Sequence, residues 1–376
     1  METHGKPVIA IAHDYVTQRG GAERVVLALS SIFPEATIYT TLFDKGHTYP
    51  EFSEKVMVTS WLNRIPLIRR HHRLGLPLFP LATSSLKIDA DIVIASSSAW
   101  AHGVSTRGKV LVYCYTPARF LYLRDQYLGS TGGAGILRWF VRVMSPFLKS
   151  WDQKAAHRAT EYVAISTEIQ QRIRDVYEIQ ADIVFPPLGV STGAPQATLE
   201  LPKAFGMSNG YYLLVSRLLP YKNVEHVVET FRQRPQDRLL IVGNGPLKDI
   251  LTNDLPVNIH VLSDISDENL RWAYANCVAL LAPSYEDFGL TVIEAAAWGK
   301  PSLALRAGGY LDTVVEGTTG IYFDEPTIAL IGQALDEHYK SNFVAEAIVE
   351  HAQTFGYERF SREISSRVFR LLSHSE

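Results

Sequence analysis

Hydrophobic positions along this chain alternate between short continuous runs and segments in which apolar residues recur every three or four positions. Continuous runs predict buried parallel strands, and the 3.6-residue spacing predicts helices packed against them. In the first half, strands are expected at 8–12, 36–42, 91–95, 110–114, 162–166 and 183–186. A helix is expected at 21–33, where the apolar face is formed by Val25, Val26, Leu29 and Phe33.

The second half repeats this alternation. Strands are expected at 211–216, 238–242, 258–262, 278–282, 302–305 and 320–323. Helices are expected at 223–233, 246–253, 267–276, 290–298, 309–316 and 326–340. Strands that alternate with helices in this way predict a parallel sheet covered on both faces, so the predicted fold class is α/β with doubly wound sheets.

A length of 376 residues exceeds what one hydrophobic core usually organises, so two domains are expected. Residues 191–207 are rich in Pro, Gly, Ser and Thr and form the expected linker. This linker separates an N-terminal domain, 1–190, from a C-terminal domain, 208–356. The final segment, 357–376, has apolar residues at helical spacing.

Composition and charge exclude several classes of protein. Apolar residues make up 47% and charged residues 20%, as in soluble globular proteins, and a net charge of −3 gives no overall nucleic-acid signature. Cys114 and Cys277 lie far apart in apolar runs, which offers neither a disulfide framework nor a zinc site. No apolar run reaches the roughly 18 residues of a membrane span, and the N-terminus begins a strand rather than a signal peptide. A cytoplasmic location is therefore expected.

The stretch 278–300 predicts a strand, a loop and a helix N-terminus, which together form an anion site. The backbone amides directed at the anion would be those of Gly289, Leu290 and Thr291. Glu286 and Glu294 lie beside this site, and because a carboxylate repels phosphate, we expect these acids to bind hydroxyl groups. A phosphate site next to hydroxyl-binding acids indicates a sugar nucleotide.

The loop after the strand at 211–216 presents two cations, Arg217 and Lys222. A guanidinium fork and an ammonium point charge together suit a diphosphate without a metal, although such a pair is also compatible with a solvated surface. The sequence has no evident Asp-x-Asp metal motif. We therefore expect a metal-independent site with no cofactor.

Glycines stand at other strand ends. Gly20 and Gly21 follow the first strand, where they allow either close approach to a ligand or a simple tight turn. Gly243 and Gly245 end the strand at 238–242 and permit close passage near a nucleotide. None of these forms the G-x-G-x-x-G fingerprint, which argues against a dehydrogenase.

The run Glu286-Asp287-Phe288-Gly289-Leu290, followed by Glu294-Ala295, resembles the E-x₇-E signature of retaining glycosyltransferases of family 4. The resemblance implies the GT-B fold, in which two Rossmann-like domains face a cleft and the C-terminal helix crosses back to the first domain. It implies that Glu286 is catalytic and binds donor-sugar hydroxyls together with Asp287 and Phe288. It also implies that Glu294 binds the nucleotide ribose.

The same resemblance extends to further loops of the second half and to the first glycine loop. It implies donor phosphate binding by Arg217, Lys222, Gly20, Gly21, Gly289, Leu290 and Thr291. It implies nucleotide contacts from Gly243, Gly245, Leu262 and Ser263. Ser263 is a departure, because the family usually has Gly there.

Residues 114–120 resemble the C-H-T-P-x-R stretch of bacterial exopolysaccharide and O-antigen mannosyltransferases of this family. The family's His, which contacts the donor sugar, is replaced here by Tyr115. Tyr115 and His102, on a neighbouring loop, are the two candidates for its catalytic role, although His102 is also compatible with a polar surface residue. The resemblance places Arg119 on the acceptor side.

The predicted function is transfer of a sugar, with retention, to a lipid-linked or polysaccharide acceptor in cell-surface polysaccharide synthesis. The resemblance suggests mannose from GDP-mannose, and a UDP-sugar is the alternative donor. Two other functions fit the same sequence features. One is a different GT-B enzyme, such as a nucleotide-sugar epimerase, and the other is a sugar-nucleotide-binding homologue without catalysis.

Two stretches, 64–73 and 135–149, combine basic residues with apolar and aromatic ones. This combination is typical of a segment that lies on an anionic membrane, and equally of a soluble helix with a basic outer face. The sequence therefore predicts a peripheral contact with the cytoplasmic membrane face as one of two alternatives. Nucleic acid is not an expected partner.

Overall fold

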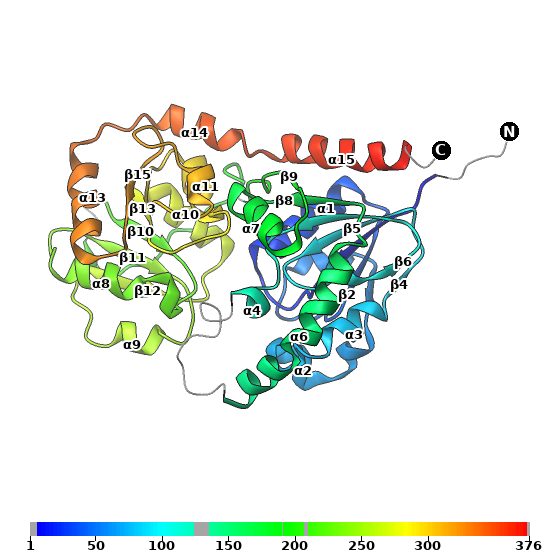
Figure 1. The fold of residues 1–376 in the computed structure, drawn as a ribbon. Coiled ribbons are helices and arrows are strands. Elements are labelled where there is room, and N and C mark those ends of the chain that lie inside the picture. The colour runs from blue at the N-terminus through cyan, green and yellow to red at the C-terminus, as the bar shows by residue number, and fades with distance from the viewer. Residues whose placement is uncertain (1–5, 124–134, 190, 207–209, 374–376) are drawn as a thin grey trace. The chain divides into compact units, whose positions relative to one another are not determined.

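The computed structural model describes residues 6–123, 135–189, 191–206 and 210–373. The chain forms two compact units (Figure 1). Unit 1 contains Met1–Pro187 and Tyr357–Glu376, and unit 2 contains Leu188–Gly356. Each unit is built around its own parallel sheet.

The sheet of unit 1 has the strand order β3-β2-β1-β5-β7-β8-β9. Its strands are β1 (Ile9–His13), β2 (Thr37–Thr40), β3 (Met57–Thr59), β5 (Ile92–Ser97), β7 (Lys109–Cys114), β8 (Glu161–Ala164) and β9 (Asp182–Ile183). All of β5 is buried, as expected for a central strand of a sheet covered on both faces. A separate two-stranded sheet pairs β4 (Lys87–Ile88) with β6 (Ser105–Thr106).

Helices complete unit 1. The α-helices are α1 (Gly21–Ile32), α2 (Pro66–Arg70), α3 (Phe79–Ser84), α4 (Arg119–Tyr122), α6 (Gly135–Ala156), α7 (Thr167–Tyr177) and α15 (Tyr357–Ser373). Short 3₁₀ turns are η1 (Pro50–Glu54), η2 (Trp61–Arg64), η3 (His72–Gly75) and η4 (Ala101–Gly103).

The last helix, α15 (red in Figure 1), belongs to unit 1 although it follows the whole of unit 2 in the chain. Its apolar stripe is buried. Phe360 from this stripe packs edge-to-face on Tyr113 of β7 with ring centroids 5.6 Å apart. Arg367 donates to Glu161 at 2.6 Å, so that charge pairing flanks the apolar contact.

The sheet of unit 2 has the strand order β12-β11-β10-β13-β14-β15. Its strands are β10 (Tyr212–Val215), β11 (Leu239–Val242), β12 (Ile259–Leu262), β13 (Ala279–Ala282), β14 (Ser302–Leu305) and β15 (Gly320–Phe323). Its helices are α8 (Val224–Arg232), α9 (Lys248–Thr252), α10 (Asp267–Asn276), α11 (Leu290–Ala297), α12 (Tyr310–Thr313), α13 (Ile328–Lys340) and α14 (Ala345–Gln353), with 3₁₀ turns η5 (Lys203–Phe205) and η6 (Pro220–Lys222).

The predicted fold class is confirmed: the chain has two units of the α/β class with parallel sheets. Each strand of unit 2 lies within its predicted segment. In unit 1 the prediction missed β3, because three half-exposed residues show no recognisable period. It also missed α14 in unit 2, whose single apolar stripe is short.

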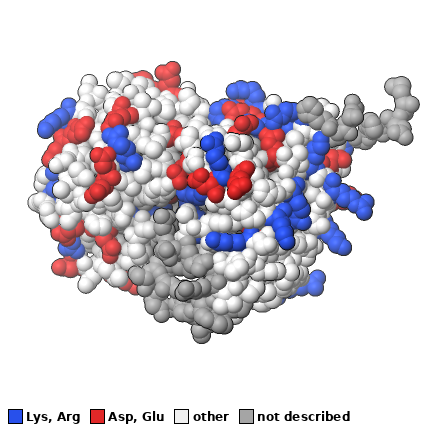
Figure 2. Space-filling model, viewed as in Figure 1, with Lys and Arg blue, Asp and Glu red and all other residues white. Residues whose placement is uncertain are grey.

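Strand order reverses once in each sheet, between β1 and β5 in unit 1 and between β10 and β13 in unit 2. At such a switch point the loops leaving the two carboxyl ends run in opposite directions, which opens space for a ligand. The space-filling view shows acidic and basic side chains mixed over much of the visible face, with mainly basic side chains at its lower right (Figure 2). We therefore expect a ligand-binding site at one of these switch points.

Candidate functional site

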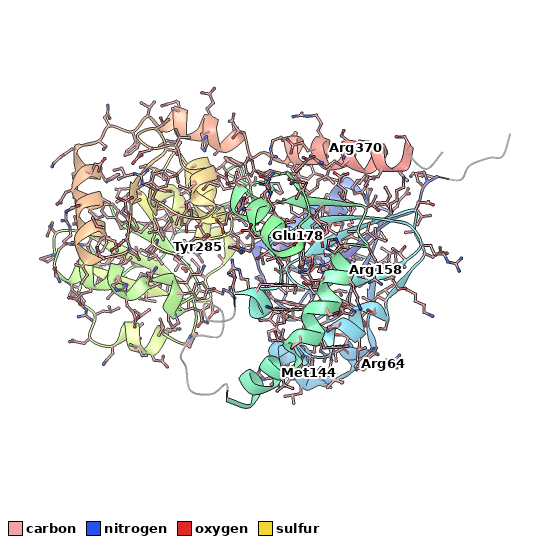
Figure 3. All side chains as sticks on the ribbon, viewed as in Figure 1. Arg64, Met144, Arg158, Glu178, Tyr285 and Arg370 are labelled. Carbon is pink, nitrogen blue, oxygen red and sulfur yellow. The ribbon has the colours of Figure 1, made fainter. Side chains whose placement is uncertain are left out.

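Two loops meet at the switch point of unit 2. One follows β10 and carries Arg217 and Lys222, and the other follows β13 and carries Ser284 and Glu286. Asn223 joins them, because its side-chain amide donates to the Pro283 carbonyl at 2.8 Å. Asn223 has a left-handed backbone and is the N-cap of α8. The residue that begins α8 therefore also connects the loop after β10 to the loop after β13. Tyr285, labelled in Figure 3, marks the second loop.

Lys222 and Glu286 form an ion pair across these loops. Ser284 Oγ donates to the same carboxylate oxygen, Oε1, at 2.7 Å. Lys222 is only 7% exposed, so its ammonium group is largely removed from water, and a buried charge needs a partner. The structure thus brings together two residues, 64 positions apart in sequence, that were predicted separately to bind phosphate and sugar hydroxyls.

Arg217 lies on the same loop but is exposed, and its Nη2 is 3.4 Å from Tyr221 Oη. The two predicted phosphate-binding cations are therefore not equivalent. Lys222 is fixed by Glu286, whereas Arg217 remains on the surface. Their roles toward a donor phosphate stay predictions.

Helix α11 starts directly after this site at Gly289, which has a left-handed backbone with φ of 94°. A Cβ at this position would meet the ring of Tyr310 at 2.6 Å, so both conformation and packing require glycine. Among the described residues, no side chain caps this helix start. The amides of Leu290 and Thr291 thus lie at the positive end of α11, where the predicted anion site places them.

Glu294 is held inside the first turns of α11. Its side chain is 9% exposed, and its Oε2 accepts a hydrogen bond of 2.8 Å from the hydroxyl of Tyr274 on α10. Tyr274 was missed by the sequence prediction, because its contact with Glu294 joins two different helices, α10 and α11. A fixed, buried carboxylate is suited to binding a ribose diol, and the ribose role of Glu294 stays a prediction.

The residues between the two glutamates differ in placement. Asp287 is partly exposed, whereas Phe288 is buried and packs on Phe355 with ring centroids 5.8 Å apart. The side chain of Phe288 therefore belongs to the core of unit 2. The predicted contacts of Asp287 and Phe288 with the donor sugar are not tested by this geometry.

Gly243 and Gly245 have an explanation within the chain itself. A Cβ on Gly243 would lie 1.8 Å from the Ser216 carbonyl oxygen, and one on Gly245 would lie 2.5 Å from that of Leu218. Both glycines thus allow the loop after β11 to pack on the loop after β10. Ser263, which follows Leu262 at the end of β12, donates to the Gly243 carbonyl at 2.7 Å and ties a third loop to them. Nucleotide contacts from these residues remain predictions.

In unit 1, His102 is buried at 4% exposure, so the alternative of a polar surface residue is wrong. Its Nε2 lies 3.1 Å from Asp152 Oδ1, and its Nδ1 lies 3.3 Å from Ser97 Oγ. Asp152 also accepts hydrogen bonds from Tyr122 and Tyr177, each at 2.8 Å. This buried cluster joins five elements of unit 1, namely β5, η4, α4, α6 and α7. The catalytic role of His102 stays a prediction.

Tyr115 is also buried, and its hydroxyl lies 2.9 Å from Ser96 Oγ and 3.2 Å from the Ala22 carbonyl. Burial raises the pKa of Tyr115 well above its ordinary value, so it acts as a neutral hydroxyl. Through Ala22, Tyr115 is tied to the start of α1, where Gly20 is the N-cap. Arg119 begins α4 and is partly exposed.

Two residues at the end of β1 were missed. Asp14 accepts backbone N–H groups from four successive residues, 98–101, at 2.5–3.0 Å. His13 bonds through Nδ1 to the carbonyl and hydroxyl oxygens of Ser96 on β5, at 2.9 and 3.0 Å. The signal in the sequence was a His-Asp pair directly after the first strand, at the sheet edge where ligands bind.

Comparison with known proteins extends this description. Residues 202–355 match the family described as glycosyl transferases group 1. Alpha-1,3/1,6-mannosyltransferase ALG2 of Homo sapiens is 22% identical over 92% of this chain and 90% of its own length. The ALG2 protein of Dictyostelium discoideum is 40% identical over 77 residues, which are 20% of this chain and 18% of that protein.

A GDP-mannose-dependent alpha-(1-6)-phosphatidylinositol monomannoside mannosyltransferase of Mycolicibacterium smegmatis is 26% identical over 52% of this chain and 56% of its own length. Among solved structures, sucrose-phosphate synthase from Thermosynechococcus elongatus superposes with a TM-score of 0.73 and 17% identity, covering 98% of this chain and all of that one. The chain thus spans less than two thirds of two of these three relatives, and the structural likeness concerns the fold.

Proposed function

We propose that this chain, whose residues 202–355 match the family described as glycosyl transferases group 1, transfers mannose from a nucleotide diphosphate donor to an acceptor hydroxyl. The family match and the GT-B fold confirm the resemblance on which the sequence prediction rested. The chain is a glycosyltransferase, and its donor, its acceptor and retention of configuration are the finer parts of the proposal.

The observation that carries the proposal is the cluster of Lys222, Glu286 and Ser284 at the switch point of unit 2. An ammonium group next to the start of α11 can receive the diphosphate charge that develops on the leaving nucleotide. When phosphate competes for Lys222, the Glu286 carboxylate becomes available to accept hydrogen bonds from sugar hydroxyls. Glu294, held by Tyr274, offers a second carboxylate for the ribose.

The donor is proposed to be GDP-mannose. The names of the relatives from Homo sapiens and Mycolicibacterium smegmatis both specify mannosyl transfer, and the latter specifies GDP-mannose. The test is nucleotide release and saccharide product formation with GDP-mannose, GDP-glucose, UDP-glucose and UDP-galactose. Preference for GDP-mannose, with an α-linked product by the one-bond carbon–proton NMR coupling at the anomeric carbon, supports the proposal. Preference for a UDP-sugar would replace the donor, and no turnover of any donor would contradict the function.

A lipid-linked acceptor at an anionic cytoplasmic membrane face is the proposed substrate setting. Within the described residues, no helix is long and apolar enough to cross a membrane. Around α2 and α3, however, several large apolar side chains are exposed. The most prominent on α2 is Leu67, which is 60% exposed, and the same region exposes Trp61, Ile65, Leu74 and Leu81. Arg64, at the edge of unit 1 in Figure 3, and Arg70 are exposed beside them.

Exposed apolar groups next to cations match a surface that rests on anionic lipid, where each cation adds about 1 kcal/mol. The predicted membrane segments also include Arg73, whose side chain lies outside the described residues. They include residues 135–149 of α6 as well, and there the side chains are described only from residue 143. Cosedimentation with anionic and neutral vesicles at low and high salt tests this. Binding only to anionic vesicles, weakened by salt, is expected, and the double variant R64E/R70E should lose it. Equal failure with both vesicle types at low salt would contradict the membrane setting.

A further inference from the structure

The imidazole of His13 has one ring nitrogen engaged and one without a hydrogen-bond partner among the described residues. Its side chain is only 4% exposed. Nε2 is not one of the fully buried polar atoms without a partner in the described part of the chain, so a ligand can reach it. His13 also ends β1, opposite Ser96 of β5, at the switch point of unit 1.

The contacts of Nδ1 determine the tautomer of this ring. Nδ1 lies 2.9 Å from the Ser96 carbonyl oxygen, and a carbonyl can only accept, so Nδ1 carries a hydrogen. Burial lowers the pKa of His13 below its ordinary value of 6.5, against opposing effects of Asp14 and of the Ser96 bond. The ring is therefore neutral near pH 7, and Nε2 presents a lone pair.

His13 stands at the carboxyl edge of the unit 1 sheet, the edge at which doubly wound sheets bind ligands. Ser96 Oγ bonds both His13 and the hydroxyl of Tyr115, the residue at the position of the family's sugar-contacting His. Tyr115 in turn bonds the Ala22 carbonyl at the start of α1, next to Gly20 and Gly21. The imidazole that the resemblance implies is thus missing from the end of β7, while an imidazole with an acceptor nitrogen stands at the end of β1, on the other side of β5.

We propose that His13 Nε2 accepts a hydrogen bond from a hydroxyl of the saccharide substrate, and that Ser96 holds the ring in the tautomer this requires. The inference rests on the proposed glycosyl transfer and adds to it a substrate-contacting residue in unit 1. His13 is neutral in this role, so it orients the hydroxyl without carrying charge. Tyr115 serves the same network by fixing Ser96.

A matched pair of variants separates this role from a structural one. In His13→Asn the amide nitrogen replaces Nδ1 and can still donate to Ser96, but the acceptor at Nε2 is lost. In His13→Gln the amide oxygen reaches the position of Nε2. We expect His13→Asn to lower kcat/KM by about tenfold, as for one neutral hydrogen bond, with an unchanged melting temperature, and His13→Gln to recover part of that loss.

The assay uses the full chain with GDP-mannose and octyl α-mannoside, and it records the KM of each and the slow release of GDP without acceptor. A defect confined to the acceptor KM identifies an acceptor hydroxyl, and a defect in GDP release identifies a donor hydroxyl. Either result supports the proposal. Equal kinetics of His13→Asn and wild type would overturn it, as would equal losses in the Asn and Gln variants.

A second measurement remains informative if a variant fails to fold or if no donor is turned over. In wild-type protein with ¹⁵N-labelled histidine, the Nε2 resonance of His13, assigned by comparison with His13→Gln, should move upfield when the two saccharide probes are added. An unmoved resonance at saturating probe would overturn the role of His13. A moved resonance without turnover of any nucleotide sugar would contradict the proposed transfer while supporting the saccharide contact.

Discussion

Lys222 and Glu286 form an ion pair between the loops that leave β10 and β13, the two strands that flank the switch point of unit 2. The pair neutralises a largely buried cation and holds the Glu286 carboxylate in place. A phosphate that takes over Lys222 would leave Glu286 to hydroxyl groups. In the proposed function, this exchange would link the charge of the donor to the release of Glu286, the acid proposed to bind the donor sugar.

The first prediction concerns Glu286. Glu286→Gln keeps the shape of the side chain but removes its charge, so it should weaken hydrogen bonds to the sugar by about 1.5–3 kcal/mol, or roughly 10- to 150-fold in kcat/KM. Steady-state kinetics with GDP-mannose measure this loss. Glu225→Gln, at an exposed position on α8, is the control and should behave as wild type. Unchanged turnover of Glu286→Gln would remove Glu286 from the mechanism.

The second prediction concerns the hydroxyl of Tyr274, which bonds Glu294. Tyr274→Phe should raise the donor KM up to about tenfold with little change in kcat, because one hydrogen bond that orients Glu294, the acid proposed to bind the ribose, is lost. Tyr211→Phe is the matched control, since it removes a buried hydroxyl that bonds the Ala273 carbonyl at 2.8 Å instead. The same rise in KM for both variants would point to general destabilisation rather than to Glu294.

The third prediction is that transfer needs no divalent metal. Lys222, Arg217 and the start of α11 are the proposed partners of the diphosphate, so activity should survive an excess of EDTA. Initial rates before and after chelation measure this. Loss of activity that Mg²⁺ or Mn²⁺ restores would show that a metal carries the phosphate charge.

The fourth prediction concerns Asp14, whose carboxylate accepts the four backbone N–H groups of residues 98–101. Asp14→Asn removes the charge and points an amide N–H group at the backbone N–H groups of residues 98–101. The free energy of unfolding of unit 1 should therefore fall by about 3 kcal/mol. Urea denaturation followed by near-ultraviolet circular dichroism reports the change. Asp89→Asn, at an exposed position, should leave the midpoint where it is. Equal midpoints for both variants would show that the loop does not depend on Asp14.

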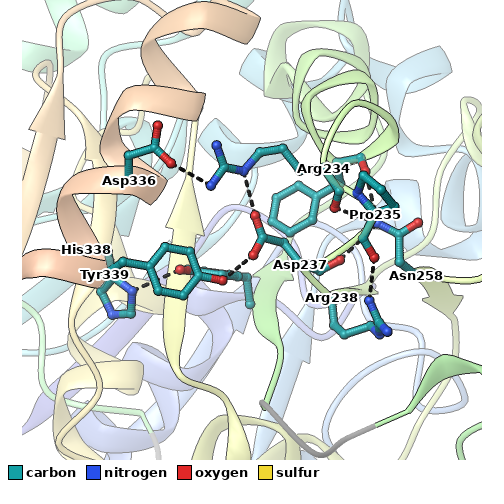
Figure 4. Close-up of polar contacts among 10 residues, drawn as sticks. Arg234, Pro235, Asp237, Arg238, Asn258, Asp336, His338 and Tyr339 are labelled. Carbon is teal, nitrogen blue, oxygen red and sulfur yellow. Dashed lines mark hydrogen bonds and ion pairs between the residues drawn. The ribbon is translucent and has the colours of Figure 1, made fainter.

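The fifth prediction is a dependence of stability on pH through His338 of α13. Its Nδ1 lies 2.9 Å from the Tyr212 hydroxyl, beside the cluster in which Asp237 binds Arg234 and Tyr339 (Figure 4). Burial lowers the pKa of His338 below 6.5, so the unfolded chain binds a proton more readily than the folded one. Stability should therefore fall as the pH drops below about 6.5, until the folded state also protonates.

The measurement is the free energy of unfolding at pH 7.5 and pH 5.5 for wild type and His338→Gln. His13 and His260 also have lowered pKa values and contribute to the same loss in wild type. The variant should lose less stability between the two pH values than wild type, because one of the three groups is gone. An identical loss of stability in the variant and in wild type would show that His338 has the same pKa in the folded and the unfolded state.

The local pattern of hydrophobic and polar residues was sufficient to predict many of the strands and helices of this protein. Apolar runs and helical spacing located the strands of unit 2, because burial on both faces of a parallel sheet leaves a continuous hydrophobic run in the sequence. The run from Glu286 to Leu290, together with Glu294, carried the resemblance to a glycosyltransferase family, since loop and helix start are contiguous in the chain. Roles assigned to these residues toward the donor remain predictions.

Other features depended on which strands became neighbours. The placement of β10 beside β13 put Lys222 next to Glu286, and the placement of β1 beside β5 put His13 next to Ser96. Strand order arises from crossover connections and from packing between segments far apart in the chain, which no local period records. Burial of His102 has the same origin, because the partner that holds it, Asp152, comes from a helix 50 residues later in the sequence. Sequence alone therefore supplied the elements and the chemical groups, and the tertiary structure decided which groups meet and which are enclosed in the core.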